Sequence, residues 1–235
     1  MNWSVPKIWQ GGDVWILGGG PSVTKLFHIP QDVIDRVRQG NESPSIYSPY
    51  MESIHNKHVI GINVAYLIGD WIDMVFFGDN GFFLKHKDAL EAWPGLKLCC
   101  STGTGSYSFI KFLMKDTKKA YGISANPKMV GWNGNSGAAS ISVAANAGAK
   151  RIFLLGFDMT LDETNSQHWH SLYRGYFEEH NLKPRQRKTP FHRHLIGFKT
   201  IAVDAKQRGI QIINVCPTSA ITEFPKVTLE EALKM

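Results

Sequence analysis

Residues 13–22 read DVWILGGGPS, an apolar run followed by three glycines, a proline and a serine. The run is typical of a buried strand, and Pro21 or Ser22 is suited to open a helix directly after the glycines. Backbone N–H groups at such a helix entry suit a phosphate or a nucleotide, although the same glycines also fit a tight turn alone. The loop has neither the G-x-G-x-x-G spacing of a dinucleotide site nor the GK[ST] ending of a P-loop. NAD chemistry and P-loop chemistry are therefore not supported.

The same pattern of strand, polar loop and helix repeats along the chain. Further apolar, β-rich runs predict strands at 57–62, 74–77, 96–100, 151–155 and 210–215. A helix of small residues is expected at 138–147. This alternation predicts an α/β fold, a single Rossmann-like, doubly wound and mostly parallel sheet, with residues 1–235 as one domain. The loops at the carboxyl ends of parallel strands share one edge, where ligands bind at the switch point in strand order.

The composition is that of a folded globular protein. The chain has 235 residues, of which 43% are hydrophobic and 20% charged, and its formal net charge is +6, which excludes a disordered or collagen-like chain. Its three cysteines, Cys99, Cys100 and Cys216, do not form a disulfide framework, so we expect a reducing, cytoplasmic location. The Gly-Gly-Asp stretch at 11–13 interrupts any signal peptide, and no apolar run is long enough for a membrane span.

Residues 162–194 break the alternation, because they are rich in His, Arg, Lys, Tyr and Asn and have no strong periodicity. We interpret them as an inserted lid over the ligand edge, since they lie between the last two predicted strands. Imidazole suits a general base or a phosphate contact, and the candidates are His168, His170, His192 and His194. No H-E-x-x-H motif or matching cysteine set accompanies these histidines, so we expect no metal site.

The lid also carries a basic cluster. Five Lys or Arg residues fall within 183–193, among them Arg185 and Arg187, and Tyr173 and Tyr176 precede them. The cluster favours an electrostatic contact to a phosphate-rich donor or to a polyanionic acceptor such as nucleic acid. A solvated surface loop is the alternative interpretation.

Two further polar sites, at 135–137 and at Asp158, lie next to a predicted helix and a predicted strand. Asn135-Ser136-Gly137 comes before the small-residue helix, where Ser136 would either cap the helix or present its hydroxyl to a ligand. Asp158 follows the strand at 151–155 and would either bind a ribose hydroxyl or hold a loop by accepting backbone hydrogen bonds. Both alternatives stay open at each position.

Several motifs stand in one order along residues 13–225. They are ILGGGPS, then GIN with VFFGDNGFF, then NSGAA leading into GAKRIFLLGFD, and finally IINVCPTS. In order and spacing the set resembles glycosyltransferase family 42, the bacterial sialyltransferases. It is also similar to the related domain of flagellar motility accessory factors, of archaeal hydroxymethylpterin diphosphokinases and of phage proteins. A phage-encoded protein of this kind would act in the host cytoplasm.

The resemblance implies a metal-independent, inverting glycosyltransferase that needs no cofactor and uses a nucleotide-sugar donor, which is CMP-sialic acid in the sialyltransferases. Taken together, the resemblance and the loops at the strand ends give these candidate donor-binding residues: Gly18, Gly19, Gly20, Pro21, Ser22, Asn63, Gly78, Asp79, Asn80, Thr102, Asn135, Ser136, Gly137, Gly156 and Asp158. The family's histidine general base falls near His192, with His194, His168 and His170 as further candidates.

The chain departs from the family pattern at three places. Gly19 and Gly78 stand where the family has asparagines, and the family's tyrosine pair is not found after Asp158. From residue type, the candidates for contact with the departing phosphate are Tyr173, Tyr176, His168, Arg185 and Arg187.

Two other functions stay open. The diphosphokinase relatives predict Mg²⁺-dependent pyrophosphoryl transfer, with Asp79, Asp158 and Asp162 as candidate ligands. A non-catalytic accessory protein that binds nucleotide or nucleic acid is the third hypothesis. The expected partners are the nucleotide-sugar donor and an acceptor that is a glycan or nucleic acid. The oligomeric state stays open, although Trp3, Trp9, Trp71 and Trp93 leave room for the interface of a homo-oligomer.

Overall fold

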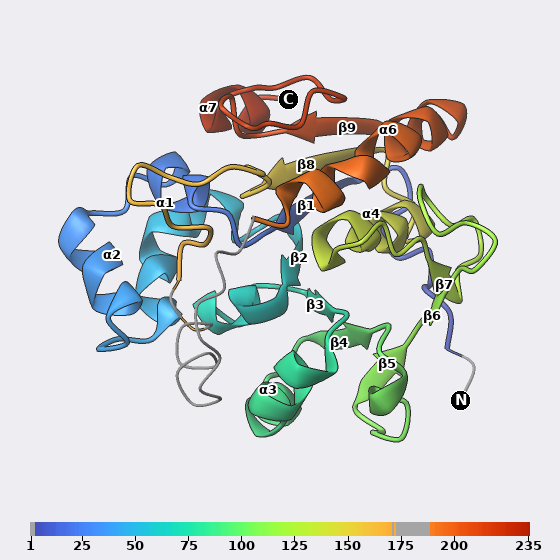
Figure 1. The fold of residues 1–235 in the computed structure, drawn as a ribbon, viewed down its shortest axis with the longest axis horizontal. Coiled ribbons are helices and arrows are strands. Elements are labelled where there is room, and N and C mark those ends of the chain that lie inside the picture. The colour runs from blue at the N-terminus through green and yellow to red at the C-terminus, as the bar shows by residue number, and fades with distance from the viewer. Residues whose placement is uncertain (1–2, 171, 173–188) are drawn as a thin grey trace.

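The computed structural model describes residues 3–170, 172 and 189–235. Its centre is a sheet of parallel strands in the order β5-β4-β3-β2-β1-β8-β9 (Figure 1). The strands are β1 (Asp13–Leu17), β2 (His58–Ile62), β3 (Met74–Phe77), β4 (Leu96–Cys99), β5 (Ile110–Phe112), β8 (Arg151–Leu155) and β9 (Gln211–Asn214). A separate parallel ladder joins β6 (Met114–Lys115) to β7 (Met129–Val130). The predicted Rossmann-like parallel sheet is confirmed.

Helices cover both faces of the sheet. The α-helices are α1 (Ser22–Leu26), α2 (Gln31–Arg38), α3 (Asn80–Ala92), α4 (Ser136–Asn146), α6 (Phe191–Gln207) and α7 (Leu229–Leu233), and the 3-10 helices are η1 (Pro44–Ile54), η2 (Asn63–Ile68) and η3 (Thr102–Thr104). Helices α4 and α6 lie together on one side of the sheet (Figure 1) and pack in one hydrophobic core, while residues of α1, α2, α3 and α7 pack in the other.

The central strands are buried on both faces. Along β1, Trp15 and Leu17 pack in the core that includes α1 and α2, whereas Val14 and Ile16 pack in the core that includes α4 and α6. Both sides of a doubly covered parallel sheet exclude water, so every position along such a strand favours an apolar residue. This burial explains why the strands stood out in the sequence as continuous apolar runs.

The order of the strands reverses at β1. Trp15 of β1 pairs with Val59 of β2 on one side and with Phe153 of β8 on the other. The chain therefore builds the sheet outward from β1 to β5 and then returns to add β8 and β9 on the opposite side. The loops that follow β1 and β8 leave the same edge at this switch point, where doubly wound sheets bind their ligands.

The structure differs from the sequence-based expectations in short elements and in one helix. Strands β5, β6 and β7 are only two or three residues long and were not predicted. Helix α6 begins at Phe191, so His192 and His194 lie in its first turn and not in an inserted loop. The buried residues of α6, which include Gly197, Phe198 and Ile201, begin only after this turn. The first turn is polar and shows no helical pattern of apolar residues, so the sequence predicted a loop there.

The predicted lid is described only in part, since residues 171 and 173–188 lie outside the described residues. In the part of the chain that the structure describes, no helix is both long and apolar enough to cross a membrane.

Candidate active site

The glycine loop after β1 is pressed against the loop after β8. Gly18 N–H donates to the carbonyl oxygen of Leu155 at 2.8 Å, and Gly20 N–H donates to that of Gly156 at 2.9 Å. A Cβ atom on Gly20 would lie 1.8 Å from Asp158 Oδ2, and Gly156 has a φ of +68°, which glycine adopts without strain. Close approach of the two loops thus requires glycine at both positions, whether or not a ligand is bound.

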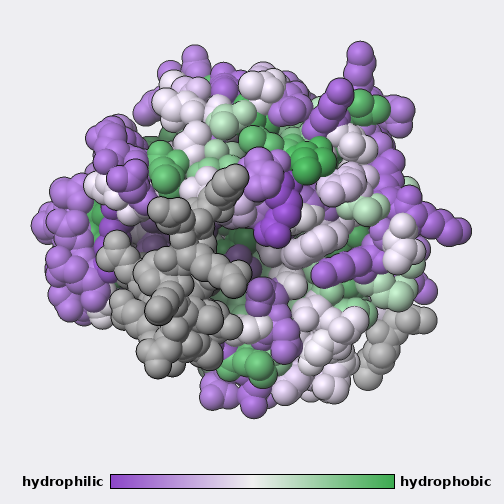
Figure 2. Space-filling view, viewed as in Figure 1, coloured by the Kyte–Doolittle hydropathy of each residue, from purple (hydrophilic) through white to green (hydrophobic). Residues whose placement is uncertain are grey.

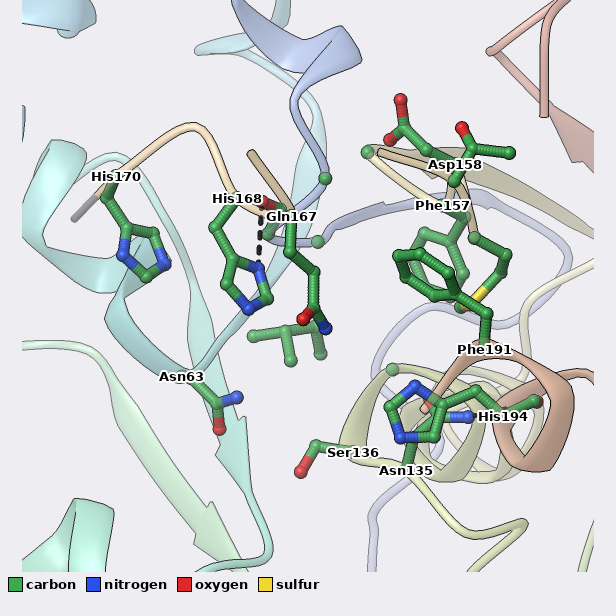
Figure 3. A pocket seen from close by; sticks show the side chains of 18 residues that line it. Asn63, Asn135, Ser136, Phe157, Asp158, Gln167, His168, His170, Phe191 and His194 are labelled. Atoms are coloured by element: carbon green, nitrogen blue, oxygen red, sulfur yellow. Dashed lines mark hydrogen bonds between the residues drawn. The ribbon is translucent and has the colours of Figure 1, made fainter. Parts of the chain in front are cut away.

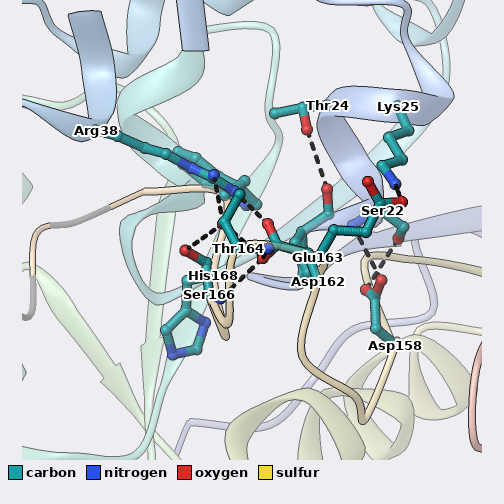
Figure 4. Close-up of polar contacts among 12 residues, drawn as sticks. Ser22, Thr24, Lys25, Arg38, Asp158, Asp162, Glu163, Thr164, Ser166 and His168 are labelled. Carbon is teal, nitrogen blue, oxygen red and sulfur yellow. Dashed lines mark hydrogen bonds and ion pairs between the residues drawn. The ribbon is translucent and has the colours of Figure 1, made fainter. Parts of the chain in front are cut away.

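Asp158 connects these two loops. Its carboxylate accepts a hydrogen bond from Ser22 N at 3.0 Å and another from Ser22 Oγ at 2.9 Å (Figure 4). Burial raises the pKa of the Asp158 carboxyl, while the hydrogen bonds from Ser22 act to lower it. Two roles were considered for Asp158, binding a ribose hydroxyl and holding a loop. In the structure the carboxylate holds a loop, because it joins the start of α1 to the loop after β8.

Residues 162–170 form a strap, and its first residue, Asp162, is bonded to Arg38 of α2. The Asp162 carboxylate accepts hydrogen bonds from Thr164 N and Ser166 N, each at 2.8 Å, and pairs with Arg38 Nη2 at 2.9 Å (Figure 4). Burial works to raise the pKa of Asp162, but the hydrogen bonds and Arg38 together lower it to about 2. The strap is therefore fixed to α2 by a charged, hydrogen-bonded turn.

Trp169 fixes the other end of the strap. The side chain is 0% exposed, and its indole Nε1 donates to the carbonyl oxygen of Gly18 at 3.0 Å. The backbone N–H of Trp169 donates to the carbonyl oxygen of Gly19, also at 3.0 Å, and the ring packs edge-on against Tyr47. The middle residue of the His-Trp-His motif is thus a core residue that holds the strap on the glycine loop.

The two histidines beside Trp169 face the ligand edge. His168 Nδ1 lies 3.3 Å from the carbonyl oxygen of Gly19 (Figure 3), and because that oxygen only accepts, neutral His168 carries its proton on Nδ1 and its lone pair on Nε2. Burial lowers the pKa of His168 to about 4. His170 is 6% exposed, stacks on His168 and also has a lowered pKa, mainly through burial.

Asn63 follows β2 with a left-handed backbone, φ +52°, which few residues other than glycine adopt. Its side-chain Oδ1 is buried and finds no hydrogen-bond partner among the described residues. An unsatisfied buried amide oxygen costs free energy, and strained residues of this kind cluster at ligand sites. Asn63 is therefore a residue of the cleft whose amide oxygen a ligand could satisfy.

The N-terminus of α4 forms the floor opposite the strap. Asn135 Oδ1 caps the helix by accepting from Ala138 N at 2.7 Å, and Asn135 Nδ2 donates to the carbonyl oxygen of His194 at 3.3 Å. Asn135 thereby holds the first turn of α6 beside α4. Ser136 lines both cavities, and its hydroxyl is turned toward the side of Asn63 (Figure 3), while Asn135 and not Ser136 caps the helix.

Two adjoining cavities lie over the carboxyl ends of the strands. The smaller has a volume of about 140 Å³ and lies at the switch point between β1 and β8, and the larger, of about 520 Å³, extends toward the start of α3. In the space-filling view the surface is hollowed near its centre, over this edge of the sheet (Figure 2). Residues that line both cavities are Asn63, Asn135, Ser136, Gln167, His168 and His194.

Most of the predicted site residues meet at this cleft. Those that line one or both cavities are Gly18, Gly19, Gly20, Asn63, Gly78, Asp79, Asn135, Ser136, Gly137, Gly156, Asp158, His168, His170 and His194. Pro21, Ser22, Asn80, Thr102 and His192 do not line either cavity. Tyr173, Tyr176, Arg185 and Arg187 lie outside the described residues. His192 is exposed, so the first turn of α6 brings His194 to the cleft in its place.

Sequence reasoning missed several lining residues. In the smaller cavity these are Phe157, Met159, Thr160, Gln167 and Phe191, and in the larger they are Lys85, His86, Trp132, Leu172 and Arg193. Phe157 and Trp132 each flank a small polar motif that was recognised, which is the signal that could have revealed them. Arg193 belongs to the basic cluster at 183–193, which predicted a phosphate contact without selecting this residue. Lys85 gave no signal, because an isolated charge on a helix is usually solvated.

The three carboxylates proposed as metal ligands lie on three separate loops, and each has its own hydrogen-bond or ion-pair partners. Asp79 caps α3 by accepting from Gly81 N at 2.7 Å and Phe82 N at 3.1 Å, while Asp158 holds Ser22 and Asp162 holds Arg38. Among the described residues, no three His, Cys, Asp or Glu side chains are grouped closely enough to hold a metal ion.

No protein-family model matches the sequence, and no curated protein matches it significantly. Solved structures of one enzyme do resemble the fold. Sialyltransferase CstII from Campylobacter jejuni, in complex with the substrate analogue CMP-3FNeuAc, matches with a TM-score of 0.50 at 16% identity, over 92% of this chain and 86% of that one. A single-residue variant of CstII in complex with CMP also gives 0.50 at 16% identity, over 91% and 86%. The chain therefore shares the fold of a sialyltransferase.

Proposed function

We propose that the protein is a sialyltransferase-like, inverting glycosyltransferase that uses a nucleotide-sugar donor. The observation that carries this proposal is the polar junction between the two cavities, where Asn63, Ser136, His168 and His194 converge at the switch point of the sheet. A shared fold alone does not assign an activity, and the site must supply it. The neighbouring CstII structures hold CMP and CMP-3FNeuAc, which gives the donor class to test first.

The smaller cavity is proposed to take the nucleoside. Its walls combine glycine backbone with the aromatic rings of Phe157 and Phe191, which offer flat apolar surface to a base. The donor phosphate would then lie at the junction, beside the N-terminus of α4. Helix N-termini favour anions, and Ser136 Oγ and the Asn63 amide add hydrogen-bonding groups there.

Transfer requires a base for the acceptor hydroxyl. The base removes the hydroxyl proton, the oxygen attacks the anomeric carbon, and the bond from that carbon to the phosphate oxygen breaks, so that the nucleotide leaves with the bonding electrons. His194 and His168 both line the junction, and burial lowers the pKa of each, which keeps the imidazoles neutral and able to accept a proton at pH 7. We favour His194, because His168 is already oriented by Gly19 beside the proposed phosphate position.

We propose that transfer does not require a metal. The Mg²⁺-dependent diphosphokinase hypothesis placed its ligands at Asp79, Asp158 and Asp162. Asp79 and Asp162 already accept hydrogen bonds from their own loops, and Asp158 accepts them from Ser22. In a metal-independent reaction the departing phosphate must be stabilised by protein donors instead. The α4 N-terminus, Ser136 and Asn63 are the described groups suited to this task.

The test is transfer or hydrolysis with CMP-, UDP- and GDP-sugars, with and without EDTA. We expect turnover with a CMP-sugar that EDTA leaves unchanged, and a loss of about 10²-fold or more in His194→Ala. His192→Ala is the matched control, because His192 lies in the same helical turn and does not line either cavity. Turnover of a nucleoside triphosphate that EDTA abolishes would favour the diphosphokinase instead. Nucleotide binding with no turnover of any donor would favour the accessory protein.

A further inference from the structure

The larger cavity has positively charged walls. Lys85 of α3 and Arg193 of α6 line it from different elements. Asp79 is the one acidic residue among its described lining residues, and the Asp79 carboxylate accepts hydrogen bonds from Gly81 N and Phe82 N. Positive charge concentrated around a concave, poorly solvated space attracts anions more strongly than the same charge spread over a surface.

Two helices also begin at this cavity. Gly81 and Phe82 lie in the first turn of α3, and Asn135 and Ser136 stand at the start of α4, and all four residues line the larger cavity. The N-terminus of α4 is capped by the neutral Asn135, so its dipole adds to the charges of Lys85 and Arg193, whereas the Asp79 carboxylate offsets the dipole of α3. The two charges and the α4 dipole come from three different elements of the fold, so the favourable potential belongs to the cavity as a whole.

Trp132 supplies a fixed aromatic wall. The Nζ atom of Lys115 lies 4.1 Å from the centroid of the Trp132 ring. A Cβ atom on Gly78 would lie 2.3 Å from the same ring, so the indole packs directly on the backbone at the end of β3. These two contacts fix the ring and cover part of it, and the part that lines the larger cavity is a preorganised surface on which the C–H face of a sugar ring packs well.

We propose that the larger cavity is the acceptor subsite and that the acceptor is a carbohydrate carrying an anionic group, a carboxylate or a phosphate. Trp132 stacks on the sugar ring, and Lys85 and Arg193 bind the charge. This inference rests on the proposed glycosyltransferase function, because the acceptor hydroxyl must reach His194 at the junction. The volume of about 520 Å³ suits a small ligand, for which sites span about 300–1,000 Å³.

The experiment measures binding of three matched probes to the CMP-saturated protein by calorimetry. The probes are methyl β-glucoside, which is neutral, methyl β-glucuronide, which carries a carboxylate, and methyl β-glucoside 6-phosphate. We expect at least one charged probe to bind about tenfold tighter than the neutral one, and the stronger of the two identifies the anionic group. Lys85→Ala with Arg193→Ala should remove this preference, and Trp132→Ala should weaken all three probes alike, about tenfold.

Controls keep the test specific. Lys87 and Lys199 lie on the same two helices, α3 and α6, but neither lysine lines the larger cavity. We expect Lys87→Ala and Lys199→Ala to keep the preference for the charged probes. Each variant must also keep wild-type CMP affinity, which shows that it is folded and that the smaller cavity is intact. Trp132→Phe is the second variant if Trp132→Ala does not fold, and it should retain most of the sugar binding.

Three outcomes would overturn the inference. Equal affinity for neutral and charged probes, with CMP binding intact, refutes the anionic acceptor and leaves the proposed function standing. Tighter binding of a single-stranded oligothymidylate, lost in the Lys85→Ala, Arg193→Ala variant, assigns the cavity to nucleic acid instead. Failure of the wild-type protein to bind any nucleotide refutes the proposed function itself and removes the premise of the acceptor subsite.

Discussion

The indole Nε1 of Trp169 donates a hydrogen bond of 3.0 Å to the carbonyl oxygen of Gly18. The bond joins the strap to the glycine loop at the switch point of the sheet, although the two residues lie far apart in sequence. Because His168 precedes Trp169 directly, the buried indole also determines where the His168 imidazole lies. A core residue thus positions a group of the candidate site.

Replacement of Trp169 by Phe tests this anchor. The variant keeps an aromatic ring in the core but leaves the Gly18 carbonyl without its donor, and an unsatisfied buried acceptor costs about 1–3 kcal/mol. In a chain of this size the expected fall in Tm is about 2–12 °C. Trp3→Phe, at a partly buried tryptophan near the N-terminus, is the control and should change Tm little. A Tm within a degree of wild type for Trp169→Phe would refute the anchoring role.

Neighbouring glycines of the loop should respond differently to alanine. In Gly20→Ala the new Cβ would lie 1.8 Å from Asp158 Oδ2, whereas in Gly19→Ala it would lie 3.0 Å from His168 Nδ1. We expect Gly20→Ala to lose more than about 3 kcal/mol of stability, measured by urea unfolding. Gly19→Ala should fold nearly normally and bind nucleotide more weakly, because only His168 must move. Equal stability of the two variants would contradict this packing.

The Asp162 turn predicts a pH dependence of stability. Its side chain is 11% exposed, and its folded-state pKa of about 2 lies below the ordinary value of 3.8. A lowered carboxyl pKa stabilises the folded state at pH values above the ordinary one, by about 2 kcal/mol here, and this contribution is lost as the pH falls from about 4 toward about 2.

Urea unfolding of Asp162→Asn between pH 3 and pH 7 measures that contribution. The variant should be less stable than wild type at pH 7, and the difference should shrink toward pH 3. Asp88→Asn removes an exposed carboxylate of α3 and should differ little from wild type at any pH. A difference for Asp162→Asn that stays constant with pH would show that the carboxylate charge does not stabilise the strap.

Arg193 should influence the titration of His194. Burial is the main cause of the lowered pKa of His194, and the charge of Arg193 lowers it further. In Arg193→Gln the pKa should therefore rise, while staying below the ordinary 6.5 because the burial persists. The His194 ring proton in a ¹H NMR titration reports this shift, with Lys199→Gln as the control. A His194 pKa that is the same in Arg193→Gln and wild type would place the two side chains too far apart to interact.

The fold could be predicted from sequence because its strands are buried on both faces. Each central strand then appears as an apolar run, as in Met74–Phe77, and each ends in a polar loop. The short strands were not predicted, for the opposite reason. Strands β5 and β6 contain Lys111 and Lys115, and a run of two or three residues is too short to show an apolar pattern.

The site could be predicted only as far as loops at strand ends identify it. Asn63, Ser136 and His194 were named in advance and meet at the cleft. Ser22 and Asp158 were also predicted to bind the donor, but in the structure they are hydrogen-bonded to each other. This pairing could not be predicted, because the sequence does not show which distant loops come together. The role of Trp169 was missed for the same reason. Its position between two histidines drew attention to the imidazoles rather than to the ring that fixes them.

The most direct measurement is the affinity of CMP by calorimetry in wild type and in Asn63→Gly. Glycine tolerates the φ of +52° at this position, so the variant removes the amide without straining the backbone. Asn80→Ala, which removes an asparagine that does not line either cavity, is the control. We expect CMP to bind wild type and Asn80→Ala alike and to bind Asn63→Gly about tenfold or more weakly. Absence of CMP binding to wild type, or equal affinity in Asn63→Gly, would contradict a nucleotide site at the junction of the two cavities.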